Sequence, residues 1–200
     1  MRVFYHRIVL VLASLSAAVV IAACSQSVEE PVEEPAAPAE SEAPLRTELD
    51  PVERGRLLIH GGGCHDCHTT KNPDGTPDMT QMLGGHPQDI IITAPFQPRE
   101  GEPWFVATNA TLTAWSGPWG VSFAPNLTSD PTGLNLTQRN FVIALKTGAH
   151  LGTARPILPP MPWTEYRNLP DEDLEAMWSY LQSIPPIANR VPEPLPPAAQ

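Results

Sequence analysis

Apolar and polar residues follow three different patterns along the 200-residue chain. An uncharged apolar run extends from residue 8 to residue 23, after two arginines in the first seven positions. Residues 25–50 are polar and acidic, and four prolines interrupt them. Beyond residue 50, short amphipathic segments alternate with stretches rich in proline and glycine. The pattern predicts a targeting segment, a linker and one domain of short helices and long loops.

Residues 50–60 have the pattern of a capped helix. Asp50 is a preferred N-cap residue, and Pro51 suits the first helical position, where its missing N–H costs nothing. Glu53 follows Asp50 by three residues, as in a capping box. The glycines at 61–63 end the predicted helix.

Residues 170–184 show an apolar stripe of helical period. The acidic residues at 171–173 lie at the positive end of the helix dipole, and two prolines at 185–186 stop the helix. The stripe consists of Leu174, Met177, Trp178, Leu181 and Ile184.

Proline accounts for 25 of the 200 residues, which excludes long uninterrupted helices or a regular sheet over most of the chain. The formal net charge of −10 argues against nucleic acid as a partner, because phosphate binding needs clustered lysine and arginine. Residues 51–200 carry nine basic and fourteen acidic residues, so the domain itself is only mildly acidic. Charge therefore gives little support for a basic docking partner.

The apolar run is shorter than the roughly 20 residues of a spanning helix, and its layout is that of a secretory signal. It ends with Ile21-Ala22-Ala23-Cys24, which resembles the lipobox of bacterial lipoproteins. The resemblance implies a lipid on Cys24 and, because Ser25 follows, sorting to the outer membrane of a Gram-negative-type bacterium. A plain signal peptide cut near Ala23 and an uncleaved anchor are the alternatives. In each case the domain lies outside the cytoplasm, on the periplasmic side.

We divide the chain into a signal peptide (1–23), an acidic, proline-rich linker (24–50), a domain (51–191) and a proline-rich tail (192–200). The linker has eight acidic residues and one basic residue. Such a segment cannot bury enough apolar surface to offset its ordering entropy. It is either a tether that lets the domain reach a partner from the membrane or a passive spacer.

The sequence Cys-His-Asp-Cys-His at 64–68 is a C-x-x-C-H motif, the attachment signature of c-type haem. At this spacing Cys64 and Cys67 add to the two haem vinyl groups as thioethers, and His68 meets the iron as an axial ligand. With Cys24 assigned to the lipid, the three cysteines leave none for a disulfide.

Two other kinds of site use the same residue types. A thioredoxin-like redox pair needs a βαβ setting, and no such strand pattern surrounds the motif. A zinc site needs further ligands at regular spacing, and only scattered histidines such as His86 and His150 are available.

Around the motif the sequence resembles the class I cytochromes c, and more closely the haem modules of alcohol- and gluconate-dehydrogenase cytochrome subunits. The two helices above take part in the resemblance. So do residues 125–134 (PNLTSDPTGL), similar to a segment near one haem edge, and residues 158–163 (LPPMPW), similar to the distal loop. Taken alone, the first of these stretches is a polar turn before a core helix.

The resemblance implies an all-α class I cytochrome c fold, with short helices around one covalently attached haem c. It also implies that the two terminal helices cross where Gly55 meets Tyr180, and that Met161 is the second axial ligand. A methionine fills a core by default, as we expect for Met177. The flanking prolines and Trp163 reverse that default for Met161, and Met/His ligation raises the haem potential.

Between His68 and Met161 lie 92 residues, more than a small class I domain needs. The excess falls mainly at 86–120 and forms a long loop insertion, in which residues 90–92 are a candidate short strand. The insertion either covers the haem or forms an aromatic docking surface. It also leaves His86 or His150 as rival ligands.

These observations predict a membrane-anchored monohaem cytochrome c on the periplasmic side. It transfers single electrons between a dehydrogenase or respiratory complex and an acceptor, and it is an electron carrier rather than an enzyme. Its partners are redox proteins (a dehydrogenase, an oxidase or another cytochrome) and the membrane, through the lipid. The alternative is a five-coordinate haem enzyme or gas sensor, which needs an open iron position.

Overall fold

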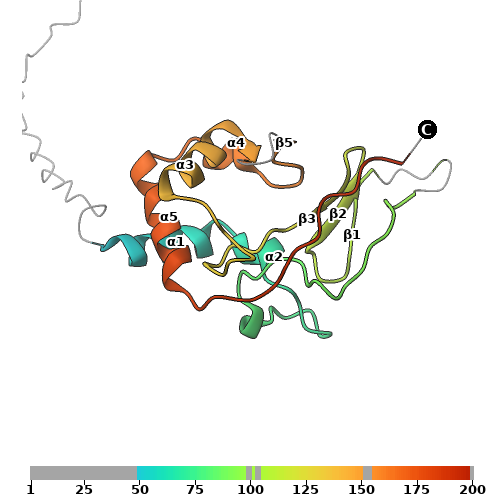
Figure 1. The fold of residues 1–200 in the computed structure, drawn as a ribbon, viewed down its shortest axis with the longest axis horizontal. Coiled ribbons are helices and arrows are strands. Elements are labelled where there is room, and N and C mark those ends of the chain that lie inside the picture. Colours follow the sequence, from blue (N-terminus) through green and yellow to red (C-terminus); the bar gives the residue numbers. More distant parts are fainter. Residues whose placement is uncertain (1–48, 98–100, 102–104, 151–154, 199–200) are drawn as a thin grey trace, which may run out of the picture. The chain divides into compact units, whose positions relative to one another are not determined.

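The computed structural model describes residues 49–97, 101, 105–150 and 155–198 (Figure 1). All of them belong to one compact unit, Ala43–Gln200. The predicted signal peptide, Cys24 and nearly all of the linker lie outside the described residues. In the described part of the chain, no helix is long and apolar enough to cross a membrane.

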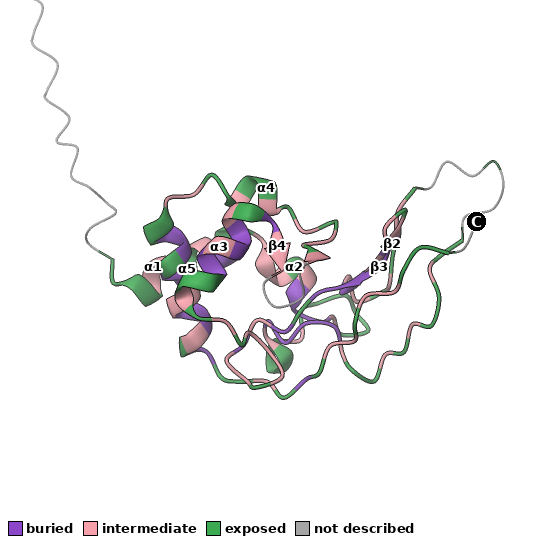
Figure 2. Ribbon diagram, turned by 45° about the horizontal axis from the view of Figure 1, so that its top comes forward, coloured by how far each residue is buried: buried purple, intermediate pink, exposed green. Residues whose placement is uncertain are grey.

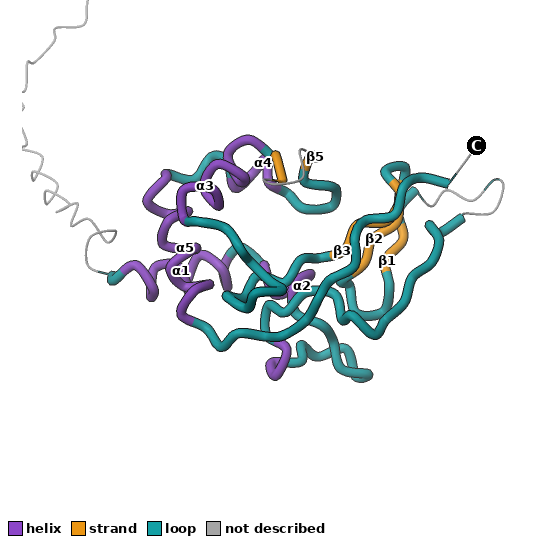
Figure 3. Tube along the Cα trace, viewed as in Figure 1, coloured by secondary structure: helices purple, strands orange, loops and turns teal. Residues whose placement is uncertain are grey.

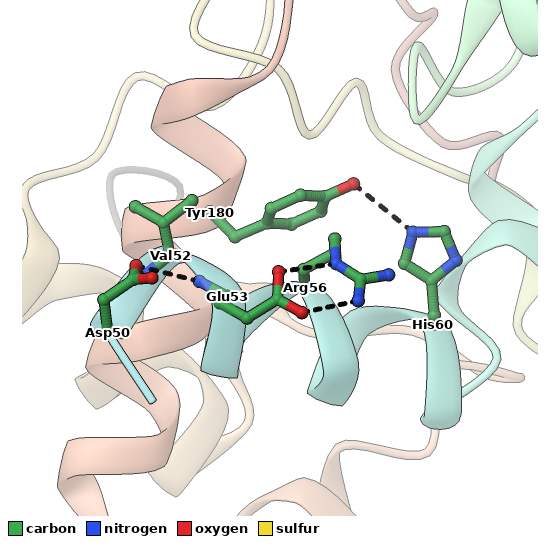
Figure 4. Close-up of polar contacts among 6 residues, drawn as sticks. All are labelled: Asp50, Val52, Glu53, Arg56, His60 and Tyr180. Carbon is green, nitrogen blue, oxygen red and sulfur yellow. Dashed lines mark hydrogen bonds and ion pairs between the residues drawn. The ribbon is translucent and has the colours of Figure 1, made fainter. Parts of the chain in front are cut away.

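Helix α1 spans Pro51–Gly61 and confirms the predicted N-terminal helix. The Asp50 carboxylate accepts hydrogen bonds from the backbone N–H groups of Val52 (3.0 Å) and Glu53 (3.1 Å), as Figure 4 shows. The capping box does not form. The Glu53 carboxylate instead accepts two hydrogen bonds from the Arg56 guanidinium, at 2.8 and 2.6 Å, because the two side chains lie one helical turn apart.

Helix α5 spans Asp171–Ser183 and packs across α1. Four members of the predicted stripe are buried, and Trp178 is half-buried at its margin. The crossing lies where the sequence places it: a Cβ on Gly55 would lie 1.9 Å from the Ala176 carbonyl oxygen and 2.9 Å from Tyr180 Cβ. Only glycine allows the two backbones this close.

The remaining helices are short. They are α2 (Cys64–His68), the 3₁₀ turn η1 (Met79–Gln81), α3 (Gln138–Thr147) and α4 (Trp163–Tyr166). Helices α1 and α3 each pack against α5, and Figure 2 shows buried residues on α3 and α5. The main hydrophobic cluster lies between these helices and consists of Ile59, Leu83, Phe141, Val142, Leu145, Leu174, Met177, Tyr180, Leu181 and Ile184.

The domain is mostly helical, but the expectation of an all-α fold is corrected by two small sheets. Strands β1 (Ala107–Thr108), β2 (Ala114–Gly117) and β3 (Gly120–Phe123) form an antiparallel sheet in the order β1-β2-β3. Strands β4 (Ala149–His150) and β5 (Arg155–Pro156) form a second pair.

The three-stranded sheet belongs to the insertion, where residues 105–123 carry no charge. Gly120 has a φ of 96°, which allows the tight turn between β2 and β3. The sheet buries a second small cluster, made by Ala114, Val121 and Phe123 with Ile92, Val191 and Leu195. Residues 90–92 form no strand, so that prediction is wrong; a turn bond from Ile90 N–H to the Pro87 carbonyl bends the chain there.

After α5 the chain returns along the loops to the sheet, a path that Figures 1 and 3 show as one extended segment. Leu195 and Val121 exchange two backbone hydrogen bonds, at 2.9 and 3.0 Å. The buried Asn189 side chain donates to the carbonyls of Gly84 (2.7 Å) and His86 (2.9 Å). We call residues 185–196 the C-terminal strap, because they join the helical part to the insertion.

Candidate functional site

The C-x-x-C-H motif forms helix α2, which begins directly after a left-handed Gly63. Its two cysteines are free thiols and half-buried, whereas His68 is 6% exposed. A single helical turn thus carries two thiols followed by a buried imidazole.

The His68 ring has a fixed orientation. Its Nδ1 lies 2.9 Å from the Pro125 carbonyl oxygen, which only accepts, so Nδ1 carries the proton and donates it. Burial lowers the pKa of His68, which favours the neutral imidazole that binds metals. Among the described residues Nε2 has no hydrogen-bond partner, so it is the nitrogen left for a ligand bond.

Pro125 is the first residue of the segment 125–134, and contacts of this segment fix its position. The buried Asn126 donates to the Ile187 carbonyl at 2.7 Å, and its oxygen accepts from the Thr128 N–H at 3.0 Å. Gly133 packs so closely on this turn that a Cβ there would lie 2.5 Å from the Thr128 carbonyl oxygen. The sequence singled out this stretch, but the acceptor role of Pro125 was not predicted, because a main-chain acceptor leaves no mark in residue type.

The predicted distal residue, Met161, is half-buried and packs against the main hydrophobic cluster, as Cys64 does. Two hydrogen bonds hold the loop of Met161 in place. Ser122 Oγ of β3 donates to the Pro159 carbonyl at 2.5 Å, and Trp163 N–H donates to the Met161 carbonyl at 2.9 Å. Hydrogen bonds thereby hold the loop to strand β3 and to the start of α4.

Tyr166 of α4 connects the loop of Met161 to the turn before the motif. Its hydroxyl donates to the Gly62 carbonyl at 2.6 Å. Burial raises the pKa of the Cys64 thiol to about 11, and the nearby Tyr166 hydroxyl acts in the opposite direction. The sequence analysis did not identify Tyr166. The one available signal for it is its position, five residues after Met161.

The insertion reaches the motif through Trp115. Burial raises the pKa of the Cys67 thiol, and the Trp115 indole N–H lowers it, so this ring lies beside Cys67. The indole also donates to the Leu112 carbonyl at 2.9 Å. This part of the insertion therefore lies near the motif, and its two predicted roles stay predictions.

The two rival histidines occupy other environments. His86 is fully buried, with Nδ1 2.8 Å from Thr113 Oγ1 and Nε2 2.9 Å from the Ile90 carbonyl oxygen. Both of its ring nitrogens are therefore engaged by the protein. His150 is half-buried on β4, where burial lowers its pKa.

The donor set fits a covalently held haem. Helix α2 carries two half-buried thiols and an imidazole whose Nδ1 is already satisfied. The Cys64 side chain and the Met161 thioether pack against the same apolar cluster. Cysteine thioethers with His/Met axial ligation are a known haem arrangement. Across the described ranges, no group of three or more His, Cys, Asp or Glu side chains is placed to hold a metal ion.

No protein-family model matches the chain. It is 27% identical over 164 residues to one of the subunits of nicotinate dehydrogenase from Pseudomonas putida, a match covering 74% of this chain and 11% of that relative. It is 33% identical over 81 residues to the cytochrome c subunit of the quinone-type alcohol dehydrogenase of Gluconobacter oxydans. This second match covers 38% of the chain and 17% of the relative.

The chain thus has distant homology to dehydrogenase subunits, one of them a cytochrome c subunit. It spans less than a fifth of the length of each of these relatives.

Proposed function

We propose that residues 51–191 form a monohaem cytochrome c that carries single electrons. In this proposal Cys64 and Cys67 hold the haem as thioethers, and His68 and Met161 are its axial ligands. The observation that carries the proposal is the 2.9 Å hydrogen bond from His68 Nδ1 to the Pro125 carbonyl, which leaves Nε2 for the iron. The distant cytochrome c relative supports the class.

When bound, haem c supplies an iron that gains and loses one electron. The chain's own residues determine how far the axial ligands move when the iron gains or loses an electron. Asn126 and Gly133 brace Pro125, which holds the His68 ring. Ser122 fastens the loop of Met161. Axial ligands that are held by neighbouring residues keep their positions in both oxidation states. This favours rapid electron transfer.

The proposal describes an electron carrier and not a catalyst, because two protein ligands leave no open position for a substrate. The relatives are dehydrogenase subunits, which supports a dehydrogenase as one redox partner. We further propose that lipidated Cys24 holds the domain on the periplasmic side of the outer membrane of a Gram-negative-type bacterium. The lipobox-like sequence before Cys24 supports the anchor.

The test is spectroscopic. We expect the ferric protein to show a near-infrared sulfur-to-iron charge-transfer band, and the reduced protein to bind no carbon monoxide. Met161→Ala removes the band and opens the iron to carbon monoxide. Met79→Ala is the matched control, because this methionine is exposed on η1 and its loss leaves both properties unchanged. Carbon monoxide binding by the wild type, without the band, would establish the five-coordinate enzyme or sensor instead.

A further inference from the structure

Lys71 lies three residues after His68, on a closed loop that fixes its backbone. Residues 71 and 77 form an antiparallel bridge, and Asn72 N–H donates to the Thr76 carbonyl at 2.8 Å. Gly75, with a φ of 84°, allows the reversal between them. The loop therefore presents the lysine side chain from a defined position.

The Lys71 ammonium binds the C-terminal end of helix α2. Its Nζ lies 3.1 Å from the His65 carbonyl oxygen, 2.9 Å from that of Asp66 and 2.6 Å from that of Thr69. An ammonium has three N–H donors, and each finds a main-chain carbonyl here. Most lysine side chains extend into water, so the binding of all three ammonium donors to main-chain carbonyls sets Lys71 apart.

The His65 carbonyl already accepts from the Thr69 N–H at 3.2 Å, so Lys71 adds a second donor there and supplies a donor to the carbonyls of Asp66 and Thr69. The last four carbonyls of any helix lack partners inside it, and α2 has only five residues. A helix this short has little stability of its own. A cation at its C-terminal end satisfies the carbonyls and complements the negative end of the dipole.

We infer that Lys71 is a positioning residue for the haem: it caps the helix that carries the attachment motif and places a fixed positive charge beside the site. The inference rests on the proposed function. A positive charge disfavours the added positive charge of the oxidised iron, so the Lys71 ammonium raises the midpoint potential. The cap itself keeps Cys64, Cys67 and His68 on one helical turn.

The test compares Lys71→Met, which removes donors and charge, with Lys71→Gln, which keeps amide donors, and Lys71→Arg, which keeps the charge. Lys146→Met is the matched control, because Lys146 also donates to a carbonyl, that of Leu169 at 2.6 Å, but on helix α3. The readouts on the purified haem protein are redox titration, thermal unfolding and the fraction of chains with attached haem.

We expect Lys71→Met and Lys71→Gln to lower the midpoint potential, so that the oxidised-to-reduced ratio at a fixed ambient potential rises about twofold or more. Lys71→Arg stays near the wild type. We also expect Lys71→Met to reduce thermal stability or haem attachment more than Lys71→Gln does. A loss of attached haem in Lys71→Met, with normal attachment in Lys146→Met, supports the capping role.

A Lys71→Met protein with wild-type potential, stability and attachment would overturn the inference. A shift equal to that of Lys146→Met would also overturn it, because the effect would then follow net charge. Failure of the proposed function is separate: it appears in the wild type, as a missing near-infrared band and binding of carbon monoxide.

Discussion

Replacing Gly55 by alanine tests whether α1 and α5 depend on direct contact between their backbones. The added methyl carbon would lie 1.9 Å from the Ala176 carbonyl oxygen and 2.5 Å from its carbon. Both atoms belong to the backbone of α5, so no side-chain rotation relieves the clash. The helices must separate, and they carry half of the buried residues of the main hydrophobic cluster between them.

The expected cost follows from two opposing effects. Overpacking a well-packed contact typically costs about 1–3 kcal/mol, and a backbone contact belongs at the upper end. Alanine returns up to about 1 kcal/mol, because glycine is a poor helix former. We therefore expect Gly55→Ala to lower the free energy of unfolding by about 2 kcal/mol. For a domain of this size that lowers the melting temperature by about 4–8 °C.

Thermal unfolding of the haem protein, followed by far-ultraviolet circular dichroism, measures the effect. Gly61→Ala is the matched control, because it lies at the end of the same helix and a Cβ there meets nothing within 4 Å. We expect this control to be neutral or slightly stabilising. If Gly55→Ala melts at the same temperature as Gly61→Ala, the close helix crossing is refuted.

Two further perturbations test the buried polar groups. The ion pair of Arg54 and Asp173 has side chains 15% and 2% exposed, so Asp173→Ala leaves a buried charge unpaired and costs about 3 kcal/mol in denaturant unfolding. The Arg56 side chain is 43% exposed, so its removal costs under about 0.5 kcal/mol, and equal losses in the two variants would contradict this reasoning. Burial lowers the pKa of His86, so the unfolded chain takes up its proton first and stability falls as pH drops below about 6.5. His86→Gln should flatten that fall in pH-dependent melting curves, and an unchanged slope would count against it.

Local signals predicted the terminal helices well. Asp50 and Pro51 begin α1 because capping depends on neighbouring residues, and the stripe of α5 follows from helical period alone. The close contact at Gly55 came from the family resemblance, and the structure adds that Ala176 is the nearest neighbour. The assignment of Glu53 failed because Arg56 offers a charged partner one turn away.

The insertion and the support of the site were less accessible from the sequence. Strand β3 completes its pairing with Leu195, far along the chain, and such a partner has no local signature. The acceptor for His68 is a backbone carbonyl, and any residue at position 125 supplies one. The three carbonyls bound by Lys71 are also backbone acceptors, so residue types alone do not predict them.

The C-terminal strap has a consequence for the order in which the domain assembles. A chain is synthesised from its N-terminus, so the motif at 64–68 and strand β3 emerge well before Leu195 and Asn189. Until the strap arrives, the outer edge of β3 and the carbonyls of Gly84 and His86 lack their partners. These contacts can form only after the cysteines and most of the domain have been synthesised, so the strap takes no part in any earlier step of assembly.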